Sequence, residues 1–301
     1  MGRRRVSHPA PTTIGSRTFT WGARTFVMGI VNMTPDSFSG DGLLAGAGAR
    51  SATHADDDHV AAAVAQALEM AKEGADLLDI GAESTRPGHA AVPETEELRR
   101  VIPVLRAVRA ALPELPITID TTKPGVAMAA LQHGADAIND IWGVGEDDAL
   151  TRLAAETGVP IVLMHNRAEP RYANVIAEVV ADLRRAVERA LDAGVPAANV
   201  IVDPGIGFGK TAEQNLEVLR ELGALRTLGR PILLGASRKS TLGKVLDGLP
   251  PEDRIEATVA ATALGIAAGV DIVRVHDVRE NVRAARMADA VVRGTWHDPA
   301  R

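Results

Sequence analysis

Residues 200–210 read VIVDPGIGFGK, a short apolar run that ends in an aspartate and a glycine-rich turn. Seven other runs have the same form. A strand that is apolar throughout is typical of a parallel sheet buried on both faces. In a barrel of such strands, reactive groups gather just beyond the C-terminal strand ends. The other runs, in chain order, are VMGIVNMTPDSF, DLLDIGAESTRPG, ITIDTTK, AINDIWG, IVLMHN, PILLGASRKS and DIVRVHDV.

Stretches with helical periodicity separate these runs, so strands and helices alternate along the whole chain. The pattern predicts an α/β protein that forms a single (β/α)8 TIM barrel. We expect strands near 25–31, 77–80, 117–119, 137–139, 160–164, 200–202, 232–234 and 271–275. We expect helices near 57–73, 93–112, 124–134, 147–157, 174–193, 212–222 and 278–292, with a seventh helix that starts after Ser240, is interrupted by Pro250-Pro251 and continues over 252–268.

Two further features flank this repeat. The segments 12–14 and 18–21 are rich in β-formers and enclose Gly15-Ser16-Arg17, which predicts a β-hairpin that caps the barrel floor. Residues 32–58 lack periodicity, and loops of this length in a compact domain are usually functional lids or disordered. We therefore expect long mobile loops after strands one and two. We expect residues 1–8 to be a flexible tail and 9–296 to be one barrel domain.

Composition excludes several classes of protein. The 301 residues suit one barrel, for which about 250 is typical. The net charge of −6 provides no basic footprint, so we expect no nucleic-acid partner. No apolar run approaches the ~20 residues of a membrane span, so we expect no membrane partner. The sequence has no cysteine, which excludes disulfides and thiolate sites and agrees with a cytoplasmic protein.

The predicted strand ends place a polar set at one rim of the barrel. A carboxylate such as Asp203 can accept two parallel N–H bonds from a flat heterocycle, and an arginine such as Arg274 can bind phosphate oxygens with two N–H groups. One subset, Asp120, Asn139, Asp203 and Lys239, suits a ring with mixed donors and acceptors. A second subset, Asn32, Arg86, Arg274 and His276, suits a phosphate or pyrophosphate, and Asn32 is also a plausible partial ligand for Mg²⁺.

Seven segments in register are similar to the dihydropteroate synthase family, and they cover the chain from about residue 25 to 293. They are Asn32-Met33-Thr34-Pro35-Asp36-Ser37-Phe38-Ser39, Glu83-Ser84-Thr85-Arg86-Pro87-Gly88, Ile119-Asp120-Thr121, Asn139-Asp140, 203–210, Gly235-Ala236-Ser237-Arg238-Lys239 and Arg274-Val275-His276-Asp277. The resemblance implies an enzyme that joins 6-hydroxymethyl-7,8-dihydropterin pyrophosphate to 4-aminobenzoate and releases pyrophosphate. It also implies a Mg²⁺ ion and a homodimer.

The resemblance implies a role for each matching residue. The catalytic residues are Asp36, Arg86, Lys239, Arg274 and His276. The pterin is held by Asp120, Asn139, Met164, Asp203, Lys239 and Arg274. The aminobenzoate is framed by Thr85, Arg86, Pro87, Phe208 and Ser237. Pyrophosphate meets Asn32, Arg86, Arg274 and His276, and the metal meets Asn32.

Two alternatives remain open at this point. A methyltransferase that passes a methyl group from methyltetrahydrofolate to a corrinoid protein would share the barrel and the pterin carboxylates. It would not need the anion-binding segments 237–239 and 274–276, which favour the synthase. A non-catalytic paralogue that only binds pterin is the third hypothesis, and the intact Asp36, Arg86 and Arg274 argue against it.

Two residues near the glycine-rich turn are expected to have other roles. Lys210 is interpreted as a solvated residue at a helix start, and His165 as a structural residue. A Walker phosphate loop is excluded because Pro204 stands where that motif requires glycine.

Overall fold

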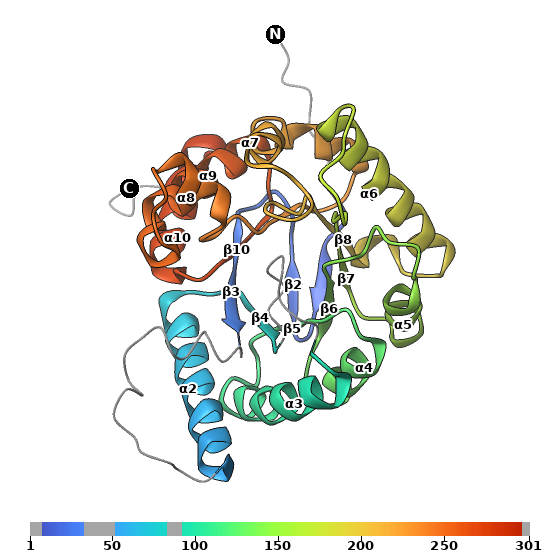
Figure 1. Ribbon diagram of the computed structural model, residues 1–301, viewed down its shortest axis with the longest axis vertical. Coiled ribbons are helices and arrows are strands. Elements are labelled where there is room, and N and C mark those ends of the chain that lie inside the picture. The colour runs from blue at the N-terminus through green and yellow to red at the C-terminus, as the bar shows by residue number, and fades with distance from the viewer. Residues whose placement is uncertain (1–7, 33–51, 83–91, 297–301) are drawn as a thin grey trace.

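The computed structural model describes residues 8–32, 52–82 and 92–296, with side-chain environments from residue 58 in the second range. Within these ranges eight parallel strands stand side by side and helices surround them (Figure 1). The strands are β3 (Phe26–Asn32), β4 (Leu77–Gly81), β5 (Ile117–Asp120), β6 (Ala137–Asp140), β7 (Ile161–Met164), β8 (Val200–Asp203), β9 (Leu233–Leu234) and β10 (Ile272–Val275).

The sheet closes into a barrel between its two edge strands. The strand order is β8-β7-β6-β5-β4-β3-β10-β9. A parallel bridge joins Val202 of β8 to Ile232, just before β9, and the Val202 N–H donates to the Pro231 carbonyl over 3.0 Å. The predicted (β/α)8 barrel is therefore confirmed.

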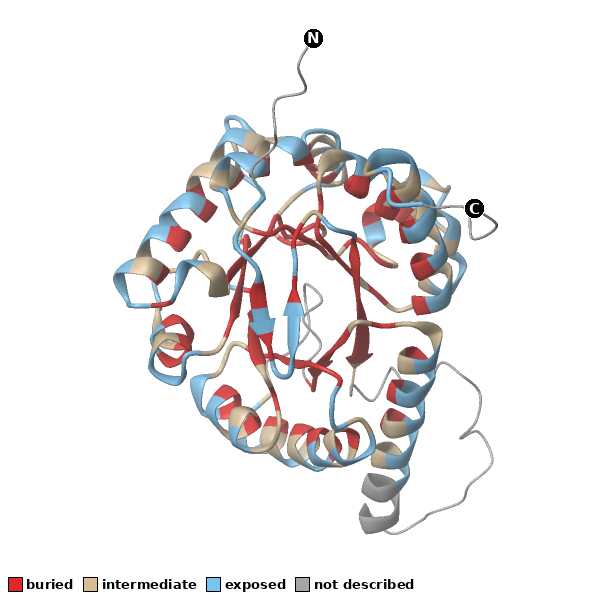
Figure 2. Cartoon of the chain, turned by 180° about the vertical axis from the view of Figure 1, so that it is seen from behind, coloured by how far each residue is buried: buried red, intermediate tan, exposed pale blue. Residues whose placement is uncertain are grey.

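Helices cover the outside of the barrel, with their inner faces buried and their outer faces exposed (Figure 2). They are α2 (Ala52–Glu73), α3 (Glu94–Ala111), α4 (Pro124–Gln132), α5 (Ala149–Thr157), α6 (Val175–Asp192), α7 (Ala212–Arg220), α8 (Ser240–Val245), α9 (Ile255–Ala268) and α10 (Val278–Val292), with short 3₁₀ turns η1 (Ala197–Asn199), η2 (Leu222–Leu228) and η3 (Pro251–Asp253). No helix in the described ranges is long and apolar enough to cross a membrane.

An antiparallel hairpin, β1 (Thr12–Ile14) and β2 (Arg17–Phe19), seals the floor of the barrel. Its Ile14 and Phe19, with the following Trp21, pack against the first inward residues of the strands, such as Leu77 and Ile272. Phe19, Trp21 and Phe26 form a cluster with ring centroids 4.8–5.8 Å apart. The predicted cap is confirmed, and with the floor closed the C-terminal rim is the end of the barrel that can hold a ligand.

One sequence prediction needs correction, and others fall outside the described residues. The expected loop extended to Asp58, but α2 begins at Ala52. Residues 52–58, ATHADDD, carry no apolar stripe, so periodicity could not reveal this first part of the helix. The tail before His8 and the predicted mobile loops at 33–51 and 83–91 lie outside the described residues.

Candidate active site

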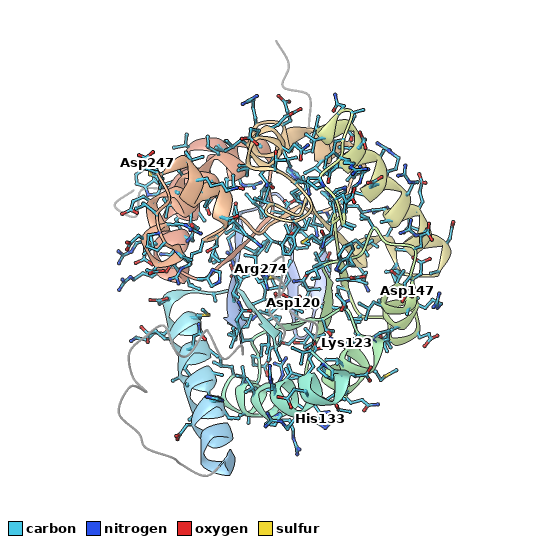
Figure 3. The ribbon with its side chains drawn as sticks, in the orientation of Figure 1. Asp120, Lys123, His133, Asp147, Asp247 and Arg274 are labelled. Carbon is cyan, nitrogen blue, oxygen red and sulfur yellow. The ribbon has the colours of Figure 1, made fainter. Side chains whose placement is uncertain are left out.

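Alternation along the strands decides which side chains enter the barrel. On β5 to β8 the outward residues, such as Ile119 and Ile138, belong to the core under the helices. The intervening residues point inward, and near the floor they are apolar, such as Ala137 and Val162. At the next inward position toward the C-terminal rim the residues are polar, except for one methionine that lies among them. They are Asp79, Asp120, Asn139, Met164, Asp203 and Arg274. Figure 3 shows Asp120 and Arg274 toward the middle of the barrel.

Arg274 joins two buried carboxylates from different strands. Its Nε lies 2.5 Å from Asp79 Oδ2, and its Nη2 lies 2.7 Å from Asp120 Oδ2. Asp79 also accepts a hydrogen bond from Asn139 Nδ2 over 3.0 Å and one from the Thr118 hydroxyl. The Asp79 side chain is 0% exposed and that of Arg274 is 14% exposed. This network holds Asp120, Asn139 and Arg274 in one fixed arrangement.

One oxygen of Asp120 is left unpaired by the described residues. Its Oδ1 is buried and has no hydrogen-bond partner among the described residues. An unpaired buried acceptor costs about 1–3 kcal/mol, so such an atom in a native structure calls for a donor. Asp203, at the end of β8, uses Oδ1 to accept the Gly205 N–H over 2.7 Å, and no described residue donates to its Oδ2. Two carboxylate oxygens therefore stand ready to receive N–H groups.

Both carboxyl groups have raised pKa values. Burial raises the pKa of Asp120 to about 7, while Arg274 and Lys239 lower it and Asp79 raises it. Burial raises the pKa of Asp203 to about 6, while the Gly205 N–H, Lys239 and Arg274 lower it. Because the same two cations act on both carboxyl groups, these four residues share one electrostatic environment. Perturbed carboxyl groups of this kind cluster at functional sites.

This shift predicts a pH effect on stability. The pKa values rise on folding from an ordinary value of 3.8, so between about pH 4 and 7 the folded chain holds protons that the unfolded chain has lost. The contribution of these groups to the free energy of unfolding should therefore fall as the pH rises through this window, by up to ~1.4 kcal/mol per pH unit for each proton. Urea unfolding across this range measures it, and Asp203→Asn should give a shallower dependence. Identical slopes for both proteins would contradict the prediction.

An aromatic and cationic wall stands beside the carboxylates. The Lys239 Nζ lies 3.8 Å from the centroid of the Phe208 ring. Phe208 packs with Met164 and Ile141 in a small apolar cluster. Gly207 has φ +84°, and a Cβ there would lie 2.9 Å from Lys239 Cδ, so only glycine permits this close approach. A flat ring has an apolar surface to rest on here, with carboxylates at its edge.

The ends of β9 and β10 are tied together. Ser237 Oγ lies 3.0 Å from His276 Nδ1 and accepts the His276 backbone N–H over 3.2 Å. The neighbouring Arg238 pairs with Asp277, with Nε to Oδ2 at 3.0 Å. Ser237 and His276, expected at the aminobenzoate and pyrophosphate sites, are thus neighbours at one part of the rim.

Asn32 was the predicted metal ligand. It ends β3 and is half-buried, and it pairs in register with Gly81 of β4. The described residues hold no group of three or more His, Cys, Asp or Glu side chains arranged to bind a metal. Mg²⁺ usually keeps several waters and is held by few protein oxygens together with substrate phosphates. One amide oxygen at the rim fits an ion of that kind.

Four predicted site residues, Asp36, Thr85, Arg86 and Pro87, lie outside the described residues. The others lie at one rim. The sequence prediction placed Arg274 in both the pterin and the pyrophosphate sets, and in the structure two of its nitrogens bind the Asp79 and Asp120 carboxylates. Arg274 is the inward residue of β10 two positions before His276, and so lies one layer deeper in the barrel.

Sequence reasoning missed Asp79. It lies inside a strand whose other residues are apolar, so it was absorbed into the run DLLDIG. Strand alternation could have found it, since Leu77 faces inward and Asp79 is the next inward position. The interpretation of Lys210 as a solvated residue was wrong: its Nζ donates to the carbonyls of Gly205 and Phe208 over 3.0 and 3.1 Å. His165 is fully buried and hydrogen bonded, as a structural residue would be.

Comparison with known proteins places this arrangement in a family. Residues 28–276 match the model of the family described as pterin binding enzyme. The dihydropteroate synthase of Clostridium beijerinckii is 48% identical over 281 residues, which cover 93% of this chain and 99% of the relative. A solved dihydropteroate synthase of Xanthomonas albilineans with 4-aminobenzoic acid superimposes with a TM-score of 0.84 at 43% identity, covering 94% of this chain and 98% of that one. The same enzyme in complex with 7,8-dihydropteroate gives a TM-score of 0.81 at 41% identity, with the same coverage. The chain therefore belongs to the pterin binding enzymes and, within them, to the dihydropteroate synthases.

Proposed function

We propose that the protein condenses 6-hydroxymethyl-7,8-dihydropterin pyrophosphate with 4-aminobenzoate, and so forms 7,8-dihydropteroate and pyrophosphate. The observation that carries the proposal is the pair of carboxylate oxygens that no described residue binds, Asp120 Oδ1 and Asp203 Oδ2, next to the apolar wall of Phe208 and Met164. A pterin offers a flat ring with N–H groups along its edge, and this pocket offers the complementary acceptors.

The pterin ring rests on Met164 in this proposal, with Asp120 and Asp203 accepting its N–H groups and Asn139 offering both a donor and an acceptor. Lys239 supplies a cation for a ring carbonyl or nitrogen. Since Arg274 keeps Asp120 in place through an ion pair, it sets the position of the ring edge. Its Nη1 makes no hydrogen bond to a described residue and is available to an oxygen of the pyrophosphate.

The reaction has an SN1-like, cationic transition state in this proposal. As pyrophosphate departs, positive charge builds on the pterin methylene, and the ring delocalises it. Arg274 and His276, with Arg86 and Asn32, stabilise the departing anion, and Asp36 stabilises the cation. A preorganised charge of this kind contributes about 10²–10³ in rate. The arylamine nitrogen then attacks, and Thr85, Arg86, Pro87, Phe208 and Ser237 frame its approach. No protein nucleophile is required, because positioning two substrates supplies much of the acceleration.

Mg²⁺ fits this scheme as an ion held by Asn32 together with the substrate pyrophosphate. When bound, it would neutralise charge on the leaving group. The protein's own part is to hold the pyrophosphate oxygens near Arg274 and His276 and to keep water away from the reacting carbon.

A pyrophosphate-release assay tests the proposal. We expect release only when the pterin pyrophosphate, 4-aminobenzoate and Mg²⁺ are all present, and we expect the organic product to have the mass of dihydropteroate. Mixtures that each lack one component are the controls. A complete mixture without release would reject the enzyme and favour a non-catalytic pterin-binding paralogue.

We further propose one domain over residues 9–296, a homodimer and a cytoplasmic location. Large apolar side chains on the adjacent helices α9 and α10 support the dimer: Leu264 is 67% exposed, and Met287 and Val291, one helical turn apart, are 67% and 72% exposed. A partner that covers these side chains would remove apolar surface from water. The cysteine-free sequence supports the location.

A further inference from the structure

Lys210 directs its side chain into the protein behind the candidate site. Its Nζ lies 3.0 Å from the Gly205 carbonyl oxygen, 3.1 Å from that of Phe208 and 3.0 Å from His165 Nδ1. An ammonium group carries three N–H donors and no acceptor. These three acceptors therefore use its complete hydrogen-bonding capacity.

The imidazole of His165 is held in one tautomer. Its Nε2 lies 3.2 Å from Asp182 Oδ2, and a carboxylate can only accept, so Nε2 carries the proton. Its Nδ1 faces the Lys210 ammonium, which can only donate, so Nδ1 accepts. Arg167 binds the same oxygen of Asp182, with Nη2 2.7 Å from Oδ2. A chain of polar contacts thus leads from helix α6 to Lys210.

These polar contacts hold loop 204–209 in place. Three of its six residues are glycines with positive φ: Gly205, Gly207 and Gly209. Such a segment has high conformational freedom when isolated, so external contacts must fix its shape. The loop lies directly on the end of β7, since a Cβ at Gly205 would collide with the His165 carbonyl oxygen.

Two proposed substrate contacts depend on this loop. The Gly205 N–H orients the Asp203 carboxylate over 2.7 Å. The Phe208 ring lies under the Lys239 ammonium at 3.8 Å. Lys210 binds the carbonyl oxygens of Gly205 and Phe208 themselves, so it connects the two contacts with one cation.

We propose that Lys210, oriented by His165 and Asp182, is a positioning residue that fixes loop 204–209 and thereby aims Asp203 and Phe208 at the substrates. The expected effect of Lys210 on the kinetics rests on the proposed function. The expected effect of Lys210 on the order of loop 204–209 does not.

Electrostatics add a dependence on pH. Burial lowers the pKa of Lys210 to about 7. Burial also lowers the pKa of His165 to about 3, which keeps the imidazole neutral. As the pH rises through about 7, the ammonium loses a proton and one of its three hydrogen bonds. Titratable and charged groups face Lys210 from the segment after β7, from β8, from α6 and from the segment before α8: they are His165, Arg167, Asp203, Asp182 and Lys239.

Four variants test the proposal. Lys210→Met keeps the length of the side chain and removes the ammonium. His165→Leu removes the acceptor that orients it, whereas His165→Asn keeps an acceptor near the position of Nδ1. Lys244→Met, at an exposed lysine of α8, is the matched control. Two quantities are measured on the full chain: hydrogen exchange of the peptide 204–211, and KM for 4-aminobenzoate against kcat.

We expect faster exchange of this peptide in Lys210→Met and His165→Leu, a smaller effect in His165→Asn, and none in Lys244→Met. The KM should rise about tenfold in the first two variants, which corresponds to ~1.4 kcal/mol, while kcat changes less. In the wild type KM should rise through about pH 7, and in Lys210→Met it should stay high throughout. Unchanged exchange of the peptide, or an unchanged KM with faster exchange, overturns the proposal. A wild-type protein that releases no pyrophosphate rejects the proposed function instead, and the exchange data then still decide whether Lys210 holds the loop.

Discussion

Replacement of Asp203 by asparagine should weaken pterin binding by about 10²–10⁴-fold. The variant keeps an oxygen for the Gly205 N–H, so the turn after β8 is preserved. It loses the carboxylate that accepts the N–H groups of the ring. Hydrogen bonds to a charged group contribute about 1.5–3 kcal/mol each, and two of them give this range. Calorimetric titration with 6-hydroxymethylpterin measures the affinity.

Asp140→Asn provides a matched control for this experiment. Asp140 is also a buried carboxyl at the same rim; its Oδ1 accepts the Trp142 N–H over 2.9 Å, and burial raises its pKa to about 6. It follows the inward residue Asn139, so alternation directs it away from the barrel interior. We expect near-wild-type pterin affinity for this variant. Equal losses in both variants would show that Asp203 acts through the fold and not through the ligand.

The second large effect concerns stability. Arg274→Met should lower the free energy of unfolding by about 3–5 kcal/mol, because Asp79 and Asp120 then remain buried without their cation. Chemical denaturation measures the loss. The control is Lys72→Met, which breaks a surface pair with Glu69 whose side chains are 78% and 58% exposed and should change stability little.

A double variant identifies the cause of this loss. Adding Asp79→Asn to Arg274→Met removes one of the two unpaired charges and should recover part of the lost stability. The simpler view, that Arg274 contributes only packing, predicts no recovery. An Arg274→Met protein as stable as the wild type would contradict the ion-pair network altogether.

The sequence predicted the barrel well because its signals are local. Each strand is a short apolar run, and each run ends in residues that disrupt it. The predicted strand ends therefore agree with those in the structure within one or two residues. Helix α10 was predicted with the bounds that it has, 278–292. The start of α2 was missed because its first turns are polar and lack the periodicity that reveals a helix packed on a core.

The candidate site was predicted as a group of residues but not as a network. Asp120, Asn139, Asp203 and Lys239 were recognised because they lie at strand ends. Asp79 was not, because its function depends on partners 60 and 195 positions away along the chain. Lys210 was misinterpreted for a similar reason: its position before α7 resembles that of many exposed lysines, and only the folded loop shows that it turns inward.

One measurement tests the central claim most directly, namely that side chains from separate strands bind one bicyclic ring. It is a crystal structure of the protein soaked with 6-hydroxymethylpterin. We expect ring N–H groups at hydrogen-bond distance, about 3 Å, from Asp120 Oδ1 and Asp203 Oδ2, with the ring face on Met164. A pterin bound elsewhere, or one that leaves both oxygens without a donor, would contradict the account.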